Sequence, residues 1–324
     1  MAGPNDKTTD DIRDRSAIDH DDIMALNFIC DSAPVVFRRH FRQGLRSHIM
    51  EILDPREVAV ERSGKRIDGV MRFPRAEPRR MLRIFRTRLT TLGQALEEIG
   101  RVKIVERFLA PDCLATSVEC IVDYRASWGR RPVLCGFQEY VAGEVLDPWT
   151  VLDRTTLLPS LFDRLRAGDN RSGPAADSWM AAVRKRTEGF VGRIKRMIAE
   201  AGHVPDLAGV GNLIITPAGG IRLVDINNIS PVDFAPDIPL DEKGYPVCDK
   251  SVEALALIEQ KVLGRTADRR ERLYRHYLEP ERMQAVKVLE ASFRKRISGG
   301  DQAVGLRGKS PRPPGAGGSP SSLP

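Results

Sequence analysis

Apolar residues follow two different periods along this chain. Where they recur every three or four residues, an amphipathic helix is expected. Five stretches have that pattern, namely 21–53, 79–100, 177–202, 249–262 and an arginine-rich segment that ends near 297. The helix over 177–202 has the clearest boundaries, because Asp177 is a suitable N-cap and Gly202 a suitable stop. Asp249 or Ser251 is expected to cap the helix that follows.

Short runs of apolar and β-branched residues predict strands between these helices. They cover 57–60, 67–73, 102–109, 115–123, 132–141, 213–216 and 221–224. A turn at Arg62 to Lys65 and another at Pro217 to Gly220 join neighbouring runs into hairpins. Most strands lie in the first half of the chain and most helices in the second. That segregation favours an α+β fold with two lobes over a doubly wound sheet.

The two ends of the chain differ in composition from the rest. Residues 1–20 are polar and acidic, and 298–324 are rich in Gly, Pro and Ser, so both are expected to be disordered. Between them we expect a helical extension over 21–54, then a small, mainly β, N-terminal lobe over 55–142. A larger helical C-terminal lobe over 143–297 completes the predicted organisation.

Composition narrows the class of protein. The 324 residues are 41% hydrophobic and 29% charged, which is ordinary for a soluble globular protein. No apolar run is long enough for a membrane span, and the N-terminus lacks the apolar core of a secretory signal. The five cysteines are odd in number and form no Cys-x-x-Cys pair, which argues against a disulfide framework or zinc site. A reducing, cytoplasmic location is therefore expected.

The net charge of +7 comes mainly from arginine. Clusters at Arg38-Arg39, Arg79-Arg80 and between Arg83 and Arg88 raise the hypothesis of weak binding to nucleic acid or another polyanion. Solvated helix faces are the favoured alternative. Aromatic residues make up only 6% of the chain, and the clusters do not show the stacking platform of a single-strand binder.

The residues most suggestive of chemistry lie between 203 and 228. Asp206 follows the long predicted helix, Asn212 precedes one strand of a hairpin, and Asp225 follows the other. A tight hairpin brings the outer ends of its strands together, so we expect Asn212 and Asp225 side by side with Asp206 close to both. Two carboxylates and an amide make an oxygen-rich site of the kind that binds Mg²⁺ with the phosphates of a nucleotide. The carboxylate of the preceding loop, Asp206, can orient or deprotonate a hydroxyl.

This stretch resembles the catalytic loop and metal-binding aspartate of protein kinases and aminoglycoside phosphotransferases. Their pattern is His-x-Asp-x-x-x-x-Asn, followed by an Asp after a hairpin; here it reads His203, Asp206, Asn212 and, after twelve intervening residues, Asp225. The resemblance implies an atypical kinase-like fold that uses ATP and Mg²⁺. It makes Asp206 the catalytic aspartate, and Asn212 and Asp225 the metal ligands.

The same resemblance extends to the first half of the chain. The segment Gln138, Glu139, Tyr140 and Val141 is similar to the strand end and hinge whose backbone meets the adenine. Residues 67–73 are similar to the third strand, with Arg72 where that family has a phosphate-binding lysine. The helix over 79–100 would bridge the lobes, and Glu98 or Glu97 would pair with Arg72.

Several departures from the family pattern shape the functional hypotheses. Asp206 and Asn212 are one residue further apart than usual, and no Gly-x-Gly-x-x-Gly loop or Ala-Pro-Glu element is present. We therefore expect a phosphotransferase acting on the hydroxyl of an unidentified acceptor, which the pattern favours as a small molecule over a protein. An inactive pseudokinase scaffold and a basic nucleic-acid-associated protein are the alternatives.

Each candidate also has a structural explanation that the residues leave open. Asp206 is suited to capping a turn between Pro205 and Gly209, and Asn227 with Asn228 to forming one. His203 is suited to a donor beyond a helix end, and Trp149 to core packing. Glu97 and Glu98 are suited to a solvated helix face, and Gln138 with Glu139 to the end of a strand.

Overall fold

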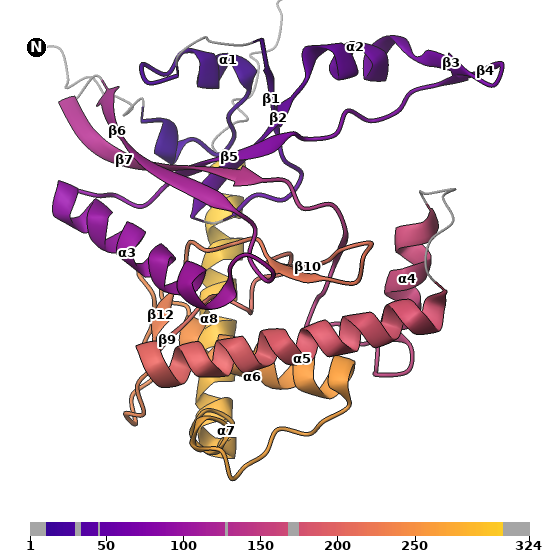
Figure 1. Cartoon of the computed structure of the whole chain (residues 1–324). Helices are drawn as coiled ribbons and strands as arrows, with labels where there is room; N and C mark the ends of the chain where they lie inside the picture. Colours follow the sequence, from indigo (N-terminus) through magenta and orange to yellow (C-terminus); the bar gives the residue numbers. More distant parts are fainter. Residues whose placement is uncertain (1–10, 30–33, 45, 127–128, 168–174, 307–324) are drawn as a thin grey trace, which may run out of the picture.

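The computed structural model describes residues 11–29, 34–44, 46–126, 129–167 and 175–306, without side chains for 126 and 298–306. Strands dominate its first half and helices its second, so the predicted α+β class agrees with the arrangement in Figure 1. The predicted segments 1–10 and 307–324 lie outside the described residues. Of the described helices, none combines the length and apolar character needed to cross a bilayer.

A five-stranded antiparallel sheet forms the first half. Its strands, in spatial order, are β1 (Val36–Arg39), β2 (Ser47–Leu53), β5 (Arg80–Phe85), β7 (Gly129–Glu139) and β6 (Ser117–Ala126). Helix α3 (Leu92–Leu109) lies along one side of this sheet (Figure 1). The predicted strands over 115–123 and 132–141 correspond to β6 and β7.

The first hundred residues depart most from prediction. The range 21–53 is not one helix: a short α1 (His20–Met24) is followed by β1 and β2, so these residues belong to the sheet. The predicted strand over 57–60 lies in helix α2 (Pro55–Ser63), which Asp54 caps and Pro55 opens. A 3-10 turn, η1 (Ile12–Asp14), stands where disorder was expected.

Of the helix predicted over 79–100, only 92–100 is confirmed, and the strand predicted over 102–109 is wrong. Residues 80–85 form β5, which is buried on both faces, so its apolar side chains do not alternate with polar ones as on a half-buried strand. Helix α3 begins later, after its N-cap Thr91, and continues through 102–109, where a strand was expected. Spacing of three or four residues does not separate such a strand from a helix.

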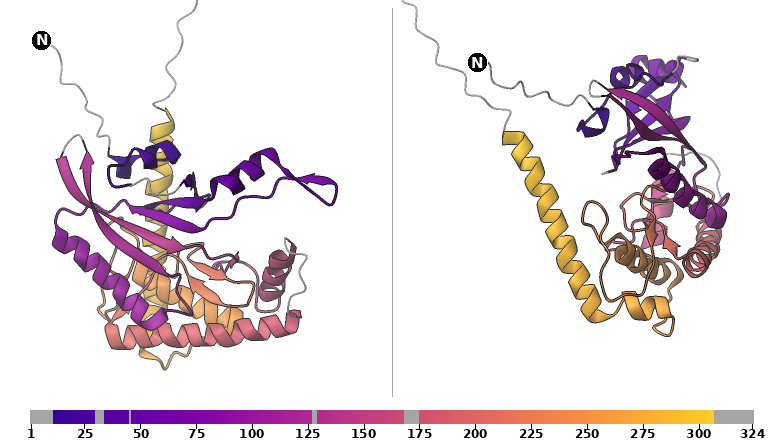
Figure 2. Two further views of the ribbon diagram at one scale, coloured as in Figure 1. Left: turned by 45° about the horizontal axis from the view of Figure 1, so that its top comes forward. Right: turned by 90° about the vertical axis from the view of Figure 1, so that its left-hand side faces the viewer.

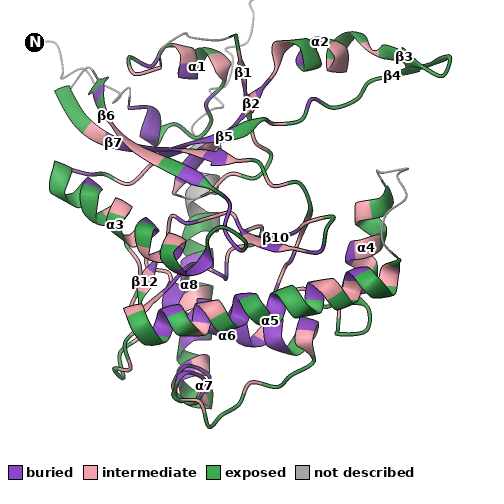
Figure 3. Cartoon of the chain, in the orientation of Figure 1, coloured by how far each residue is buried: buried purple, intermediate pink, exposed green. Residues whose placement is uncertain are grey.

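The hairpin predicted between 57–60 and 67–73, with its turn at Arg62 to Lys65, does not form, because 57–60 is helical. A different hairpin lies within 65–72, outside the main sheet. Strands β3 (Lys65–Ile67) and β4 (Val70–Arg72) pair only with each other, and all six residues are exposed. Together with α2 they make an arm that projects from the body of the molecule (Figures 1 and 3). The turn has Asp68 and Gly69 at positive φ, as a tight hairpin requires.

The second half is built around helix α5 (Ala176–Ala201), which confirms the helix expected over 177–202 although its N-cap is Ala175. The other helices are α4 (Leu157–Ala167), α6 (Val247–Ile258), the π-helical η2 (Glu259–Leu263), α7 (Arg272–Tyr277) and α8 (Pro280–Leu306). Helix α8 runs along one side of the molecule, as the right view of Figure 2 shows, and continues beyond the predicted limit at 297. Asp249 does not cap α6 but forms a buried ion pair with Arg282 of α8.

Short strands connect these helices. The predicted hairpin forms as β10 (Leu213–Ile215) and β11 (Ile221–Leu223), with β8 (Glu144–Val145) alongside β10. Strand β9 (His203–Val204) pairs with β12 (Ser230–Pro231). In Figure 1 the β10–β11 hairpin lies between the five-stranded sheet and α5.

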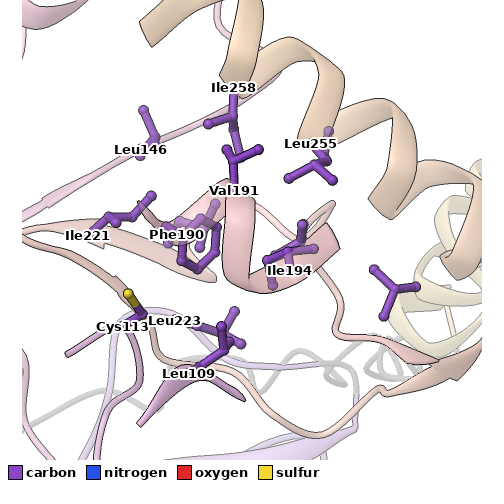
Figure 4. Packing of buried hydrophobic residues seen from close by; sticks show 14 of the residues in the cluster. Leu109, Cys113, Leu146, Phe190, Val191, Ile194, Ile221, Leu223, Leu255 and Ile258 are labelled. Atoms are coloured by element: carbon purple, nitrogen blue, oxygen red, sulfur yellow. The ribbon is translucent and has the colours of Figure 1, made fainter. Parts of the chain in front are cut away.

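A large apolar core holds the hairpin in place. Phe190 and Ile194 of α5 pack with Ile221 and Leu223 of β11 and with residues of α6 (Figure 4). Each fully buried side chain of this size stabilises the fold by about 1.5–3 kcal/mol. A separate cluster packs η1 and α1 against the sheet, which explains why residues 11–29 are ordered.

Candidate functional site

The loop after α5 is held in shape by its own hydrogen bonds. Gly202 ends the helix at φ 64°, and Asp206 follows β9. The Asp206 carboxylate accepts the N–H groups of Ala208 and Gly209 at 2.9 and 3.1 Å, so it caps a turn as one interpretation expected. Outside support comes from Ser251 of α6, whose hydroxyl accepts the N–H of Leu207 at 3.2 Å.

Asn212 lies where this loop enters the hairpin. Its Nδ2 donates to the Asp206 carbonyl at 2.9 Å, and its amide packs against Gly209, where an added Cβ would come within 2.4 Å of Nδ2. The pairing of Leu213 with Leu223 continues by one step, because Val224 N–H donates to the Asn212 carbonyl at 2.8 Å. Asp225 follows directly, so Asn212 and Asp225 share one end of the hairpin, as expected.

The environment of Asp206 changes its acidity. Burial raises the pKa of its carboxyl to about 6, and the negative charge of Asp225 acts in the same direction. Hydrogen bonds from Ala208 and Gly209, and the positive charge of Arg46, partly oppose that rise in pKa. A carboxyl that titrates near neutral pH can exchange a proton with a hydroxyl more readily than an ordinary aspartate.

A cavity opens between the five-stranded sheet and the hairpin. The predicted segment Gln138 to Val141 lines one side of it, and Asn212 and Asp225 line another. The β1–β2 connection adds His40 to Gly44. Apolar side chains of both layers complete its wall, namely Ile49, Met81, Val210, Ile214 and Val224. Asp206 lies outside this wall, while its loop contributes Gly211 and Asn212.

Two arginines line this cavity, Arg42 of the β1–β2 connection and Arg83 of β5, and the sequence analysis selected neither as a site residue. Arg83 is the one next to Asp225. Its side chain is 2% exposed, and its Nη1 donates to Asn227 Oδ1 at 3.0 Å and lies 3.7 Å from Asp225 Oδ1. Asn227 in turn donates from Nδ2 to the Ser47 hydroxyl of β2 at 3.2 Å. The signal for Arg83 was an arginine within an apolar run, since a charged residue flanked by buried ones needs a partner.

The expected pairing of Arg72 with Glu98 or Glu97 is wrong. Arg72 is exposed on the projecting hairpin and does not line the cavity. Glu98 pairs with Arg101 in its own helix at 2.5 Å, and Glu97 is exposed. The strand assignment caused the error: β5, and not 67–73, is third in the sheet.

Other singled-out residues have structural partners. His203 Nδ1 lies 2.6 Å from the Ala201 carbonyl beyond the end of α5. Trp149 packs against the core and donates from Nε1 to the Ala208 carbonyl at 2.8 Å, which buttresses the Asp206 loop. Asn227 N–H donates to Asp225 Oδ1 at 3.0 Å, so it forms the expected turn as well as its contact with Arg83.

Comparison with known proteins adds little to this geometry. The chain matches a ROP18 kinase domain, solved in complex with AMP-PNP and sucrose, at 9% sequence identity and a TM-score of 0.32. The match covers 70% of this chain and 62% of that domain, less than two thirds of its length. No family model and no curated protein matches the sequence. A TM-score of 0.32 does not establish a shared fold, so the function is inferred from the site itself.

Proposed function

We propose that this protein is a kinase-like phosphotransferase that binds ATP with Mg²⁺ and phosphorylates the hydroxyl of an acceptor. One observation carries the proposal: Asn212, Asp225, Arg83 and the segment 138–141 all line a single cavity. A triphosphate needs a cation and hard oxygen ligands, and a nucleobase needs an apolar slot with polar backbone beside it. This cavity offers each of them.

The fold is part of the proposal. Five antiparallel strands in the order β1-β2-β5-β7-β6, with α3 beside them, would form the small lobe. The long helix α5, the Asp206 loop and the β10–β11 hairpin would form the cleft side of the larger one. The segment after β7 then connects the lobes, which is where the family resemblance expects the hinge.

The residues present fit a magnesium nucleotide. Asp225 is 31% exposed at the cavity, and Asn212 stands beside it, so a carboxylate and an amide oxygen are available to a hard cation. Among the described residues no group of three or more His, Cys, Asp or Glu side chains is arranged for a metal, so the phosphates would complete the coordination. Bound ATP would supply the transferable phosphoryl group.

The roles of the remaining residues follow from their positions. Asp206 would orient the acceptor hydroxyl and accept its proton, since its pKa of about 6 leaves it largely ionised at pH 7. Arg83 takes the phosphate-binding role first assigned to Arg72. The backbone of Glu139 to Val141 would face the base, between Met81 on one side and Ile214 on the other.

The test is thermal unfolding with and without millimolar ATP and Mg²⁺. A ligand that binds only the folded state stabilises it by about 2.7 kcal/mol at a hundredfold excess over Kd, which raises the Tm by several degrees. We expect that rise to depend on Mg²⁺ and to vanish in Asp225→Ala. Asp237→Ala is the matched control, because Asp237 is exposed and outside the cavity. A wild-type Tm that does not respond to ATP and Mg²⁺ would refute the proposal.

A pseudokinase is the second candidate, and the β1–β2 connection favours it. Residues 40–44 contain one glycine, Gly44, and the Arg42 side chain covers Gly211, where an added Cβ would lie 3.2 Å from Arg42 Cδ. A side chain thus stands where the family resemblance expects a glycine-rich cover over the phosphates. Nucleotide binding without ATP turnover, in the presence of a broad panel of hydroxyl acceptors, would favour this candidate.

A further inference from the structure

The guanidinium of Arg83 is surrounded by residues from the sheet and from the segment after β11. Its Nη2 donates to the Ser117 hydroxyl at 3.3 Å and lies 3.4 Å from Glu119 Oε1. The Ser117 hydroxyl also donates to Glu119 Oε1, at 2.5 Å. The Glu119 side chain is 1% exposed, so both members of the ion pair are buried.

The register of the sheet explains how this pair forms across an intervening strand. Arg83 of β5 and Glu119 of β6 are both paired with Gly136 of β7, so all three face the same side. A Cβ at Gly136 would touch both side chains, at 3.5 Å from Arg83 Nη2 and 3.5 Å from Glu119 Oε1. Because Gly136 has no side chain, Arg83 and Glu119 can contact each other across strand β7.

The pair is incompletely satisfied within the protein. Among the described residues, Arg83 Nε and Glu119 Oε2 are buried polar atoms without a hydrogen-bond partner. Leaving such atoms unpaired is costly, and a ligand or water that meets them recovers part of that cost. Both atoms are inaccessible, and Nε lies beside Gly136, so the group that faces an anionic ligand is the part of the Arg83 guanidinium that lines the cavity.

Helix α3 takes no part in holding this arginine. In the described part of the chain, the polar groups around the Arg83 guanidinium come from Ser117, Glu119, Asp225 and Asn227. The acidic residues of α3 are used elsewhere or exposed, with Glu98 on Arg101 and Glu106 on Lys103. The orientation of Arg83 is therefore determined by the sheet and by the segment after β11.

We propose that Glu119 of β6 is the residue that positions Arg83 for the phosphates, and that this task is independent of α3. The inference rests on the proposed nucleotide site. Glu119 acts through Arg83 and does not itself touch the ligand, so it is a positioning residue. The phosphate-binding end of the cleft is then preformed, whereas an arginine held by α3 would depend on where that helix lies.

The test compares ATP with adenosine, both measured by equilibrium titration in the presence of Mg²⁺. Glu119→Gln keeps the size of the side chain and an acceptor for Ser117 but removes the charge that holds Arg83. We expect affinity for ATP to fall about tenfold or more, as for the loss of one charge-assisted hydrogen bond, with affinity for adenosine unchanged. Glu98→Gln is the matched control and should leave both affinities within about twofold, because its partner is Arg101.

Three outcomes separate the two proposals. If wild type binds ATP and Glu119→Gln binds it equally well, the positioning role is refuted and the nucleotide site stands. An equal loss of ATP affinity in Glu98→Gln would also refute it, since α3 would then matter. No ATP binding by wild type would refute the nucleotide site and this inference with it. Should Glu119→Gln fail to fold, Ser117→Ala, which removes the hydroxyl between Arg83 and Glu119, is expected to weaken ATP and not adenosine.

Discussion

The two regions that meet at the cavity are built in different ways. In the loop and hairpin from Asp206 to Asp225, neighbouring residues make the important contacts, such as Asn212 with the Asp206 carbonyl. In the sheet, Arg83 depends on Glu119, 36 residues away, and on Asn227, 144 residues away. The first region can be disturbed by local changes, whereas the second requires the whole sheet to be in register.

The contact between these regions is a short chain of hydrogen bonds. Arg83 donates to Asn227, and Asn227 donates to Ser47 of β2. Asp225 is two residues before Asn227, so these contacts connect the sheet to the carboxylate that we propose as a metal ligand as well as to the arginine. Changing one member of this chain should therefore reveal how strongly each region relies on the other.

Removing the buried charge should have the largest effect. Arg83→Met leaves Glu119 buried without its cation, and breaking a buried ion pair typically costs about 3–5 kcal/mol. We expect a lower midpoint of urea unfolding by about that free energy. Adding Glu119→Gln should restore part of the loss, since the uncompensated charge is then gone. Equal stabilities of Arg83→Met and the double variant would show that the uncompensated Glu119 charge is not the cause of the loss.

A change at Asp206 should act in the opposite direction. Its pKa of about 6 lies above the ordinary 3.8, so the folded state holds more protons between those values. Its contribution to stability is full below about pH 4 and is lost as pH rises to about 6. Asp206→Asn should thus be more stable than wild type at pH 7, on the order of 1–2 kcal/mol, and show no gain at pH 4.

Urea unfolding at both pH values measures this difference. The same variant should abolish phosphate transfer, because Asn cannot accept the proton of a hydroxyl. A stability difference that stayed constant from pH 4 to pH 7 would contradict the raised pKa of Asp206.

The smallest effect is expected at Arg72, the arginine first assigned to the phosphates. It is exposed on the β3–β4 hairpin and makes no ion pair within the described residues. Arg72→Met should change the free energy of unfolding by no more than about 0.5 kcal/mol and leave the ATP-induced rise in Tm intact. Both variants replace an arginine with methionine, so comparing Arg72→Met with Arg83→Met separates the effect of the position from the effect of losing an arginine. A loss of the ATP response in Arg72→Met would return the phosphate role to the projecting arm.

Sequence patterns were reliable for elements whose structure depends mainly on local residues. Helix α5 and the β10–β11 hairpin were predicted within one or two residues, because a long apolar stripe and a Pro-Ala-Gly-Gly turn are local signals. The proximity of Asn212 and Asp225 followed from hairpin geometry alone. The segment 138–141, predicted to meet an adenine, lines the same cavity, and its contact with a base stays a prediction.

Several of the errors concern long-range pairing, while 57–60 and 102–109 were expected as strands and lie in helices α2 and α3. The range 21–53 was expected to be helical, yet β2 becomes a strand because it is hydrogen-bonded between β1 and β5. Likewise 80–85 is a strand because β2 and β7 flank it, and its apolar residues are buried on both faces. No local signal states which neighbours a strand will have.

The sequence by itself determined the local chemistry of the loop and hairpin, since Asp206, Asn212 and Asp225 lie within 20 residues and one turn brings them together. Only the tertiary structure decided which arginine and which glutamate join them. Arg83 and Glu119 meet because the strand order places Gly136, which has no side chain, between them. Strand order depends on the burial of the whole sheet, to which distant segments of the chain contribute. No single stretch of the sequence therefore specifies which strands will be neighbours.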